Sequence, residues 1–373
     1  MRVVIIARRA QGINGTGGME RAATEIALGL SRRGHDVELV TSTPAAEAAI
    51  DFPFRVTLLP PRQRQGIRGW RDYRPWVQAV ARHVEASPPE FIVSFYGDVA
   101  ALPAGGPPVP LFTYGLEWYL TPGVHGLGLK RLYGPLGLAA IRRADYLGTC
   151  GAVHLARLYE VARPQGEAVH LHNWMQPDAG PTPPHAEARA ALGLPGDAVV
   201  LGVVSRLARD KALDVAVRAV RALRPEFPQL HFVIGGDGPE RAALETAADD
   251  DPGIRLLGRV DDATARNVMR AADATVSVAR TQYQMFAVIE ALSLGTPVLC
   301  AYAERQEGLI KEGLTGFVLP RPDEASMQRA LRRLLTMPAE ARAAMEAACL
   351  REVARGYTLD DALTIIEATA QRA

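Results

Sequence analysis

Short runs of valine, isoleucine and leucine alternate with longer amphipathic stretches along the whole chain. Runs such as Val3–Ala7 and Val199–Val204 lack polar alternation, which is typical of strands that are covered on both faces. The stretches between the runs have helical spacing. Met19–Arg33, for example, places its apolar residues on one face and is followed by the stop signal Gly34. This alternation predicts an α/β protein with doubly wound parallel sheets.

The expected strands form two groups. The first group is Val3–Ala7, Val37–Thr41, Phe91–Phe95, Val109–Thr113, Tyr146–Thr149 and Ala168–Leu171, and the second is Val199–Val204, His231–Gly235, Ile254–Leu257, Ala274–Ala279, Pro297–Cys300 and Phe317–Leu319. Between them, the proline-rich stretch Gln176–Pro184 suits an extended linker. Since 373 residues exceed one domain of ordinary size, we expect domains over residues 1–175 and 176–356. The residues alone suggest that a final helix, Leu359–Ala370, packs on the second domain.

Composition excludes several classes of protein. The formal net charge of +1 favours no nucleic-acid partner, and the three cysteines have neither disulfide nor metal-ligand spacing. No stretch approaches the roughly 18 apolar residues of a transmembrane helix. The start, MRVVIIARRA, has its apolar run before its arginines, which is the reverse of a signal peptide. We therefore expect a cytoplasmic protein, and peripheral contact with the inner face of a membrane stays open.

A glycine-rich loop, NGTGGMER, follows the first expected strand. Gly17 and Gly18 allow close approach of the backbone to a ligand, and the helix behind them offers free N–H groups. The spacing differs from the dinucleotide fingerprint, and no acidic residue ends the second strand. A nicotinamide cofactor is therefore disfavoured. An ordinary glycine turn is the alternative.

Two further loops follow strands of the second group. SRLARDK places Arg206 and Lys211 together, which suits a diphosphate whose charge grows as it leaves. A solvated basic turn is the alternative. GGDGP, with Gly236 and Asp237, is another glycine-rich turn and is weak evidence by itself.

The fourth stretch, RTQYQMFAVIEA, contains a helix that begins near Met285 and Phe286. The first amides of this helix can bind a phosphate. Glu290 lies one turn later among apolar residues, so it needs partners and can bind both hydroxyls of a ribose. An acidic residue in solvent is the alternative.

Taken in order, these motifs resemble the family 4 retaining glycosyltransferases, which have the GT-B fold. The resemblance covers nearly the whole chain and is carried by GTGGMERAATEIALGLSRRGHDVELVT, SRLARDKALD, GGDGPERAAL, IRLLGRV with ADATVSVA, IEALSLGTPVL and EGLTGFVLP. It implies two Rossmann-like domains that face each other across a cleft. The first domain would bind the acceptor and the second the donor. It also implies that the final helix, about residues 357–373, packs back on the first domain.

The resemblance implies a role for each matching residue. Arg206 and Lys211 would stabilise the diphosphate of a UDP- or GDP-sugar, and Glu290 would hold its ribose. The remaining donor-binding positions would be Gly17, Gly18, Gly236, Asp237, Gly258, Arg259, Val260, Met285, Phe286 and Ala287. No cofactor or divalent metal would be needed, because the two cations and the helix dipole fill the role of a metal.

The sugar side of the expected site departs from the family pattern. Gln282 stands where the family has the first of two glutamates, and Tyr114 stands where it commonly has histidine. Both are still expected in the catalytic region. Residues 283–286 replace a Gly-Phe-Gly-Leu pattern. These changes predict an unusual donor sugar or acceptor. The alternative is a nucleotide-binding protein that has lost transfer and acts as a partner or regulator. A nucleotide-sugar epimerase fits the order of the motifs less well.

The acceptor is the least determined part. Asp98, Glu117 and Trp118, on loops after first-domain strands, are candidate contacts for a hydroxyl of a glycan, a lipid-linked substrate or a natural product. The reaction expected from the family is departure and attack on one face of the sugar.

Arginines and aromatic residues also interleave over residues 60–76, with Arg68 and Trp70 near the centre. This stretch can meet anionic headgroups, stack on a sugar or close over the acceptor. A solvated loop with aromatic side chains tucked into the domain is the alternative.

Overall fold

The computed structural model describes residues 1–15, 17–44, 50–62, 71–95, 98–103, 106–112, 135, 137–149, 156, 159–160, 165–175, 182–279, 286–306 and 308–372. The chain forms two compact units. Unit 1 comprises Met1–His172 with Leu359–Ala373, and unit 2 comprises Asn173–Thr358. The first boundary thus lies three residues before the one expected from the sequence.

Unit 1 contains a parallel sheet of seven strands in the order β3-β2-β1-β4-β5-β6-β7. The strands are β1 (Arg2–Ile6), β2 (Asp36–Ser42), β3 (Arg55–Leu59), β4 (Phe91–Phe95), β5 (Pro110–Phe112), β6 (Tyr146–Thr149) and β7 (Glu167–His170). Every strand of the first expected group is present. The sequence pattern missed β3, which is an edge strand whose mixed polar and apolar residues are only half buried.

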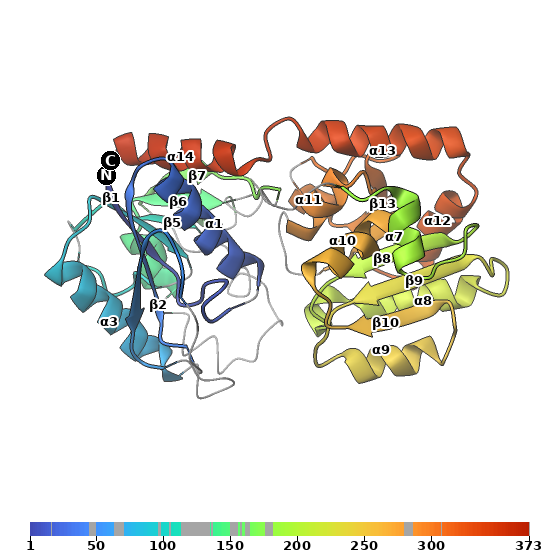
Figure 1. Ribbon diagram of the computed structural model, residues 1–373, viewed down its shortest axis with the longest axis horizontal. Coiled ribbons are helices and arrows are strands. Elements are labelled where there is room, and N and C mark those ends of the chain that lie inside the picture. Colours follow the sequence, from blue (N-terminus) through green and yellow to red (C-terminus); the bar gives the residue numbers. More distant parts are fainter. Residues whose placement is uncertain are drawn as a thin grey trace. The chain divides into compact units, whose positions relative to one another are not determined.

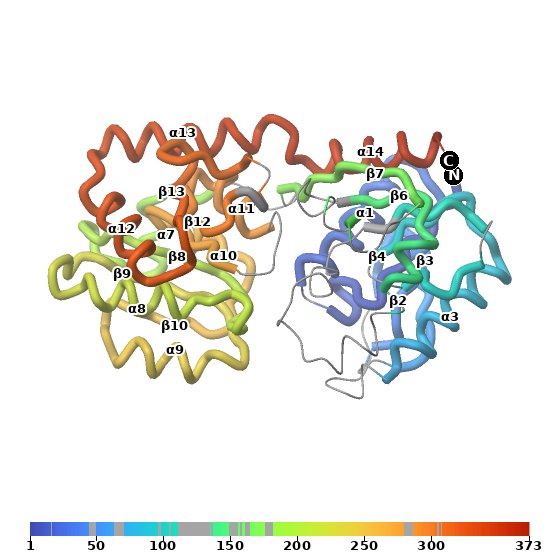
Figure 2. Tube along the Cα trace, turned by 180° about the vertical axis from the view of Figure 1, so that it is seen from behind, coloured from blue at the N-terminus to red at the C-terminus, as the bar shows by residue number. Residues whose placement is uncertain are grey.

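The helices of unit 1 whose bounds the structure gives are α1 (Gly18–Arg32), α3 (Tyr73–Ala86) and α14 (Leu359–Arg372), and residues 137–143 are also helical. α14 runs beside α1 (Figure 1), where the side chain of Leu363 lies against Gly29. The expectation from the residues alone, that this helix packs on the second domain, is therefore wrong. Figure 2 shows α3 beside β2 and β3.

Unit 2 contains a parallel sheet of six strands in the order β10-β9-β8-β11-β12-β13. The strands are β8 (Val199–Val204), β9 (Leu230–Gly235), β10 (Ile254–Gly258), β11 (Ala274–Ser277), β12 (Val298–Ala301) and β13 (Gly316–Leu319). All six match strands expected from the sequence to within two residues at either end. The buried apolar runs in the sequence were sufficient to predict these six strands.

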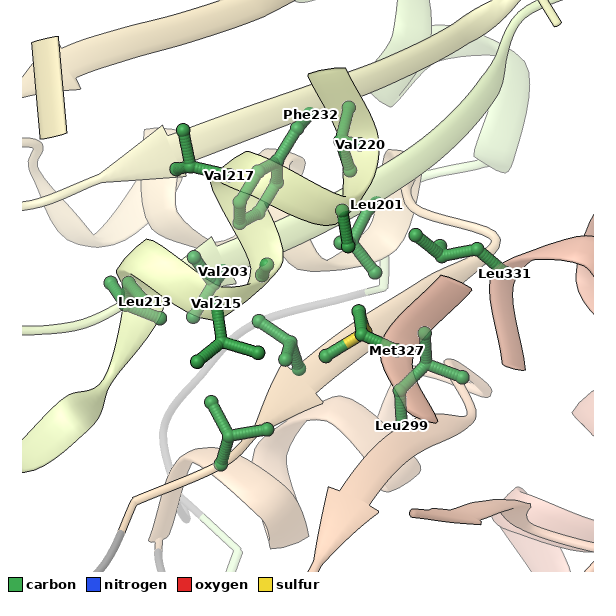
Figure 3. Close-up of a cluster of buried hydrophobic side chains, with 14 of the residues drawn as sticks. Leu201, Val203, Leu213, Val215, Val217, Val220, Phe232, Leu299, Met327 and Leu331 are labelled. Atoms are coloured by element: carbon green, nitrogen blue, oxygen red, sulfur yellow. The ribbon is translucent and has the colours of Figure 1, made fainter. Parts of the chain in front are cut away.

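Helices cover the sheet of unit 2. They are α7 (His185–Ala191), α8 (Leu213–Leu223), α9 (Arg241–Ala248), α10 (Asp262–Ala271), α11 (Phe286–Ser293), α12 (Glu324–Leu335) and α13 (Ala339–Val353), with short 3₁₀ helices η1 (Arg209–Lys211) and η2 (Ala303–Gln306). In the core, Leu201 and Phe232 from the sheet meet Val220 of α8 and Met327 of α12 (Figure 3). This apolar packing fixes the strand ends from which the functional loops emerge.

Each strand order reverses once. The reversal lies between β1 and β4 in unit 1 and between β8 and β11 in unit 2. In open α/β sheets, ligands bind beyond the carboxyl ends of the strands at such a switch point. A ligand site is therefore expected in the loops after these four strands.

Candidate functional site

A small pocket opens at the switch point of unit 2. It is formed by the ends of β8 and β11, the end of η1, and the starts of α8 and α11. The residues that line it are Val203, Val204, Ser205, Lys211, Leu213, Met269, Thr275, Val276, Ser277, Val278, Ala279, Ala287 and Val288. Most of the lining is apolar, and Lys211 is its one charged member among the described residues. The pocket therefore presents a cation against an apolar wall.

Lys211 ends the 3₁₀ helix η1, where its backbone N–H donates to the carbonyl of Ala208 at 2.9 Å. Burial lowers the pKa of its ammonium group to about 8, against the attraction of Asp210 and with a smaller contribution from Arg206. Removing a charge from water is costly. A lysine in this position is therefore poised to gain free energy when an anion arrives.

Arg206 lies on the same loop in a different environment. Its side chain is 65% exposed and forms an ion pair with Asp210, with Nη2 and Oδ1 3.4 Å apart. An exposed pair of this length contributes little to stability. The guanidinium can therefore exchange Asp210 for a ligand at small cost.

The glycine-rich turn after β9 packs directly on the loop after β8. The backbone N–H of Leu207 donates to the carbonyl of Asp237 at 2.9 Å, and the N–H of Glu240 donates to the carbonyl of Leu207 at 3.1 Å. A side chain at Gly236 would overlap the carbonyl oxygen of Ser205. The exposed Asp237 accepts the N–H of Gly238 at 2.8 Å. Packing between the two loops explains these glycines without any ligand.

The loop after β10 continues this arrangement. Gly236 donates its N–H to the carbonyl of Gly258 at 2.7 Å, and Gly258 itself has a φ of +74°. Arg259 is exposed, and the half-buried Val260 lies beside Gly235. Three consecutive loops at the carboxyl edge are thus hydrogen-bonded in a row. They provide a rigid wall next to Arg206.

α11 supplies the other side of the pocket. Its apolar face is buried, while Phe286, Ala287 and Glu290 are half buried. Glu290 lies one turn after the helix start, as the sequence predicts. Ala287 lines the same pocket as Lys211. The lysine and the first turn of α11 are therefore neighbours within unit 2.

The glycine loop of unit 1 has a partner that the sequence did not reveal. Gly17 precedes α1 as its N-cap, and Gly18 is the first helical residue. The side chain of Glu20 folds back against Gly15 and Gly17. A carboxylate is stabilised near a helix N-terminus. An anionic ligand that approached Gly17 would have to displace Glu20.

Hydrogen bonds from the side chain of Asn14 hold the glycine loop in place. The Asn14 amide donates to the carbonyl of Ser42 at 2.6 Å and to the hydroxyl of Thr41 at 3.1 Å, while its oxygen accepts from the N–H of Ala10 at 2.8 Å. These bonds tie the glycine loop to the end of β2.

Asp98 is fully buried, and its Oδ2 accepts the backbone N–H of Arg8 at 2.9 Å. Burial raises the pKa of this carboxyl to about 6, although the hydrogen bond from the Arg8 backbone and the Arg8 charge lower it. The expectation that Asp98 contacts an acceptor is contradicted by this burial. Its carboxylate joins the loops after β1 and β4 instead.

Seven of the sequence-predicted positions lie outside the described residues. They are Arg68, Trp70, Tyr114, Glu117, Trp118, Gln282 and Met285. The described part of the chain contains no group of three or more histidine, cysteine, aspartate or glutamate side chains that could hold a metal ion. Its helices also include none that is long and apolar enough to cross a membrane.

Two family models match the chain, one in each unit. The model described as Glycosyltransferase Family 4 matches residues 16–160, and the model described as Glycosyl transferases group 1 matches residues 198–337. The curated D-inositol 3-phosphate glycosyltransferase of Stackebrandtia nassauensis is 34% identical over 192 residues, which make up 47% of this chain and 43% of that relative. The match thus spans less than half the length of the relative.

Solved structures resemble the chain over its full length. Sucrose-phosphate synthase from Thermosynechococcus elongatus has a TM-score of 0.83 at 17% identity and covers 100% of this chain and 98% of its own. HepE from Anabaena, in complex with UDP and glucose, has a TM-score of 0.77 at 17% identity and covers 100% of both chains. These likenesses confirm the predicted GT-B fold.

Proposed function

We propose, since this chain belongs to the family 4 glycosyltransferases, that it transfers a sugar from a nucleoside diphosphate donor to a hydroxyl acceptor. The observation that carries the proposal is the position of Lys211 at the switch point of unit 2, where its partly desolvated ammonium lies next to the start of α11. A positive charge at the switch point of a parallel sheet suits the binding of a diphosphate.

In this proposal each nearby protein group binds a different portion of the donor. Lys211 and Arg206 neutralise the charge that develops on the diphosphate as it leaves, and the first amides of α11 bind one of its phosphates. Glu290 accepts hydrogen bonds from the ribose. Since HepE is described with UDP, a uridine nucleotide is the first donor to test. No metal is required in this proposal, because these cations supply the positive charge.

The transfer retains the configuration of the sugar. The bond between the anomeric carbon and the diphosphate oxygen breaks, and the acceptor oxygen bonds to the same face of that carbon. The acceptor proton passes to the leaving phosphate oxygen, so no protein base is consumed. Gln282 contacts the hydroxyls of the donor sugar in this proposal, and Tyr114 donates a hydrogen bond at the reacting centre.

Unit 1 binds the acceptor in this proposal. The relative from Stackebrandtia nassauensis is named for an inositol phosphate acceptor, which makes phosphorylated polyols the first class to try. Glu117 and Trp118 remain acceptor contacts in the proposal, whereas Asp98 does not.

A peripheral contact with anionic membranes accompanies this activity. Three arginines, Arg71, Arg74 and Arg82, are exposed on α3 and just before it, and Arg55 is exposed on the neighbouring β3. Exposed arginines of this kind are attracted to anionic lipid headgroups. We expect the protein to co-sediment with phosphatidylglycerol vesicles and not with phosphatidylcholine vesicles. Equal binding to both would contradict the membrane contact.

A nucleotide panel followed by a transfer assay tests the proposed function. Thermal shifts with UDP, GDP and their sugars identify the base, and transfer is then measured with and without EDTA. Lys211→Ala and Glu290→Ala should each weaken nucleotide binding and turnover at least tenfold, and EDTA should change neither. Lys311→Ala is the matched control, because Lys311 pairs with Glu352 away from the pocket.

Two results would reject the proposal or part of it. If both site variants match the wild type in nucleotide affinity and turnover, the site assignment is wrong. If nucleotide binds tightly but no acceptor class yields product and no donor is hydrolysed, the chain is a nucleotide-binding partner that has lost transfer.

A further inference from the structure

The chain passes from unit 1 to unit 2 between His172 and Asn173 and returns between Thr358 and Leu359. Just inside unit 2, these two connecting segments are bonded to each other. The backbone N–H of Met175 donates to the carbonyl of Tyr357 at 2.8 Å. Asn173 and Trp174, on the first segment, are buried. Two segments that are far apart in sequence therefore form one structural element.

This element rests on α11. Met175 and Tyr357 pack in the same apolar cluster as Val288, Ile289 and Leu292, which form the buried face of that helix. A shift of α11 would disturb this cluster, because buried apolar groups are closely packed and transmit displacement. The connecting segments and α11 are therefore mechanically joined within unit 2.

A second contact reaches the first turn of α11. The fully buried ring of Trp174 meets the ring of Phe286 edge to face, with centroids 5.5 Å apart and planes at 88°. Edge-to-face pairs have a preferred geometry, and they contribute stabilising free energy in addition to that gained from burying apolar area. Phe286 is the first residue of α11. Trp174 thus holds the helix at the end where the donor phosphate is expected.

We propose that Trp174 is a positioning residue for the donor site, acting through Phe286 on the first turn of α11. The inference rests on the proposed function, because it assumes that this turn binds the nucleotide. Trp174 itself touches no ligand in the proposal. It fixes the direction of the first backbone N–H groups of α11 before the donor arrives and thereby links the first connecting segment to donor binding. Loss of the ring would leave the turn free to adopt other orientations, and binding would then have to select the productive one.

Two substitutions of Trp174 distinguish a requirement for its aromatic contact from a requirement for apolar volume alone. Trp174→Phe keeps a ring against Phe286, and Trp174→Leu keeps apolar volume without a ring. We expect Trp174→Leu to weaken UDP binding roughly two- to tenfold, and Trp174→Phe to restore most of it. Phe286→Leu should weaken binding by a similar factor, and the double variant Trp174→Leu with Phe286→Leu should be little worse than either alone.

Tryptophan fluorescence gives a readout that a merely structural role would not move. The emission of the wild-type protein should change as UDP is added, and that change should disappear in Trp174→Phe. Trp76→Phe is the matched control, because Trp76 is the other tryptophan that is fully buried in the described structure and lies in unit 1. In that variant, the change on UDP addition should persist.

The outcomes distinguish this inference from the proposed function. If calorimetry detects no binding of any nucleotide to the wild-type protein, the proposed function fails and the inference fails with it. If UDP binds, but Trp174→Leu binds it as tightly as the wild type and the emission change survives in Trp174→Phe, only the inference fails. Should Trp174→Leu not fold, the fluorescence of the wild type, Trp174→Phe and Trp76→Phe still decides.

Discussion

Lys211 differs from an ordinary surface lysine in the pH range over which it carries charge. Its pKa of about 8 lies well below the usual value of 10.5, because burial disfavours the charged form. Below pH 8 the ammonium is present and can meet a diphosphate. As the pH rises through 8, the proton is lost and with it the attraction for an anion.

Nucleotide affinity should therefore fall in mildly alkaline solution. If only the charged form binds, UDP affinity should drop about tenfold between pH 7 and pH 9. Calorimetric titration at pH 7, 8 and 9 measures this drop. Lys211→Ala serves as the control and should bind weakly with little change over the same interval. An affinity of the wild type that stays constant to pH 9.5 would contradict the role of Lys211.

Asp98 shows where residue-level inference from sequence stops. It follows a predicted strand, and this position predicts a side chain that faces an acceptor. Its oxygen instead binds the backbone of Arg8, 90 residues away in sequence. No local pattern around Asp98 contains that information, because burial is decided by which loops the sheet brings together. The order β1-β4 places these two loops side by side, and only the topology reveals the contact.

At the scale of elements, the loops after β8 and β9 act as one structural piece. Gly236 has a φ of +129°, which favours glycine, and any side chain there would strike the carbonyl of Ser205. The turn therefore carries two separate penalties for substitution.

Gly236→Ala should destabilise unit 2 by about 1–3 kcal/mol or more, because the strained φ and the overlap add. Gly196→Ala is the matched control, since Gly196 precedes β8 in an exposed turn with open space around its Cα. It should change stability by less than about 0.5 kcal/mol. Urea unfolding measures both variants. Equal midpoints would show that the two loops are not packed as the structure has them.

Elements were more predictable than their contacts. The strands with buried apolar runs could be read directly, because covering both faces of a parallel sheet leaves a simple pattern. The strand β3 could not be predicted in this way, since it lies at the edge of the sheet and none of its residues is fully buried. The positions of Arg206, Lys211 and Glu290 followed from their places after strands. The contacts of Glu20 and Trp174 could not be predicted from the sequence, because both depend on how side chains fold back.

At the scale of the whole molecule, the last helix belongs with the first. Arg33, at the end of α1, pairs with Asp360 at 2.8 Å and with Glu367 at 2.6 Å, and His35 lies 2.8 Å from Glu367. The pKa of Glu367 is lowered because these partners favour its charged form over the opposing effect of burial. The chain therefore completes unit 1 only after unit 2 has been synthesised.

The contact between Gly29 and Leu363 tests that arrangement. Leu363 is buried on α14, and its side chain fills the space beside Gly29 that an added methyl group would need. Gly29→Ala should therefore destabilise by overpacking, about 1–3 kcal/mol, and Leu363→Ala should destabilise by leaving a cavity, about 2–5 kcal/mol. The double variant should lose less than the sum of the two, because the new methyl group enters the space that the leucine vacates.

Urea unfolding of the four proteins measures this coupling, with Leu350→Ala as a control. Leu350 is 43% exposed on α13, so its truncation should cost less than about 0.5 kcal/mol. Strict additivity of Gly29→Ala and Leu363→Ala would mean that the two side chains do not meet. Because α14 is joined to the rest of unit 1 only through its packing and the connection from unit 2, the coupling reports directly on whether the end of the chain completes the first unit.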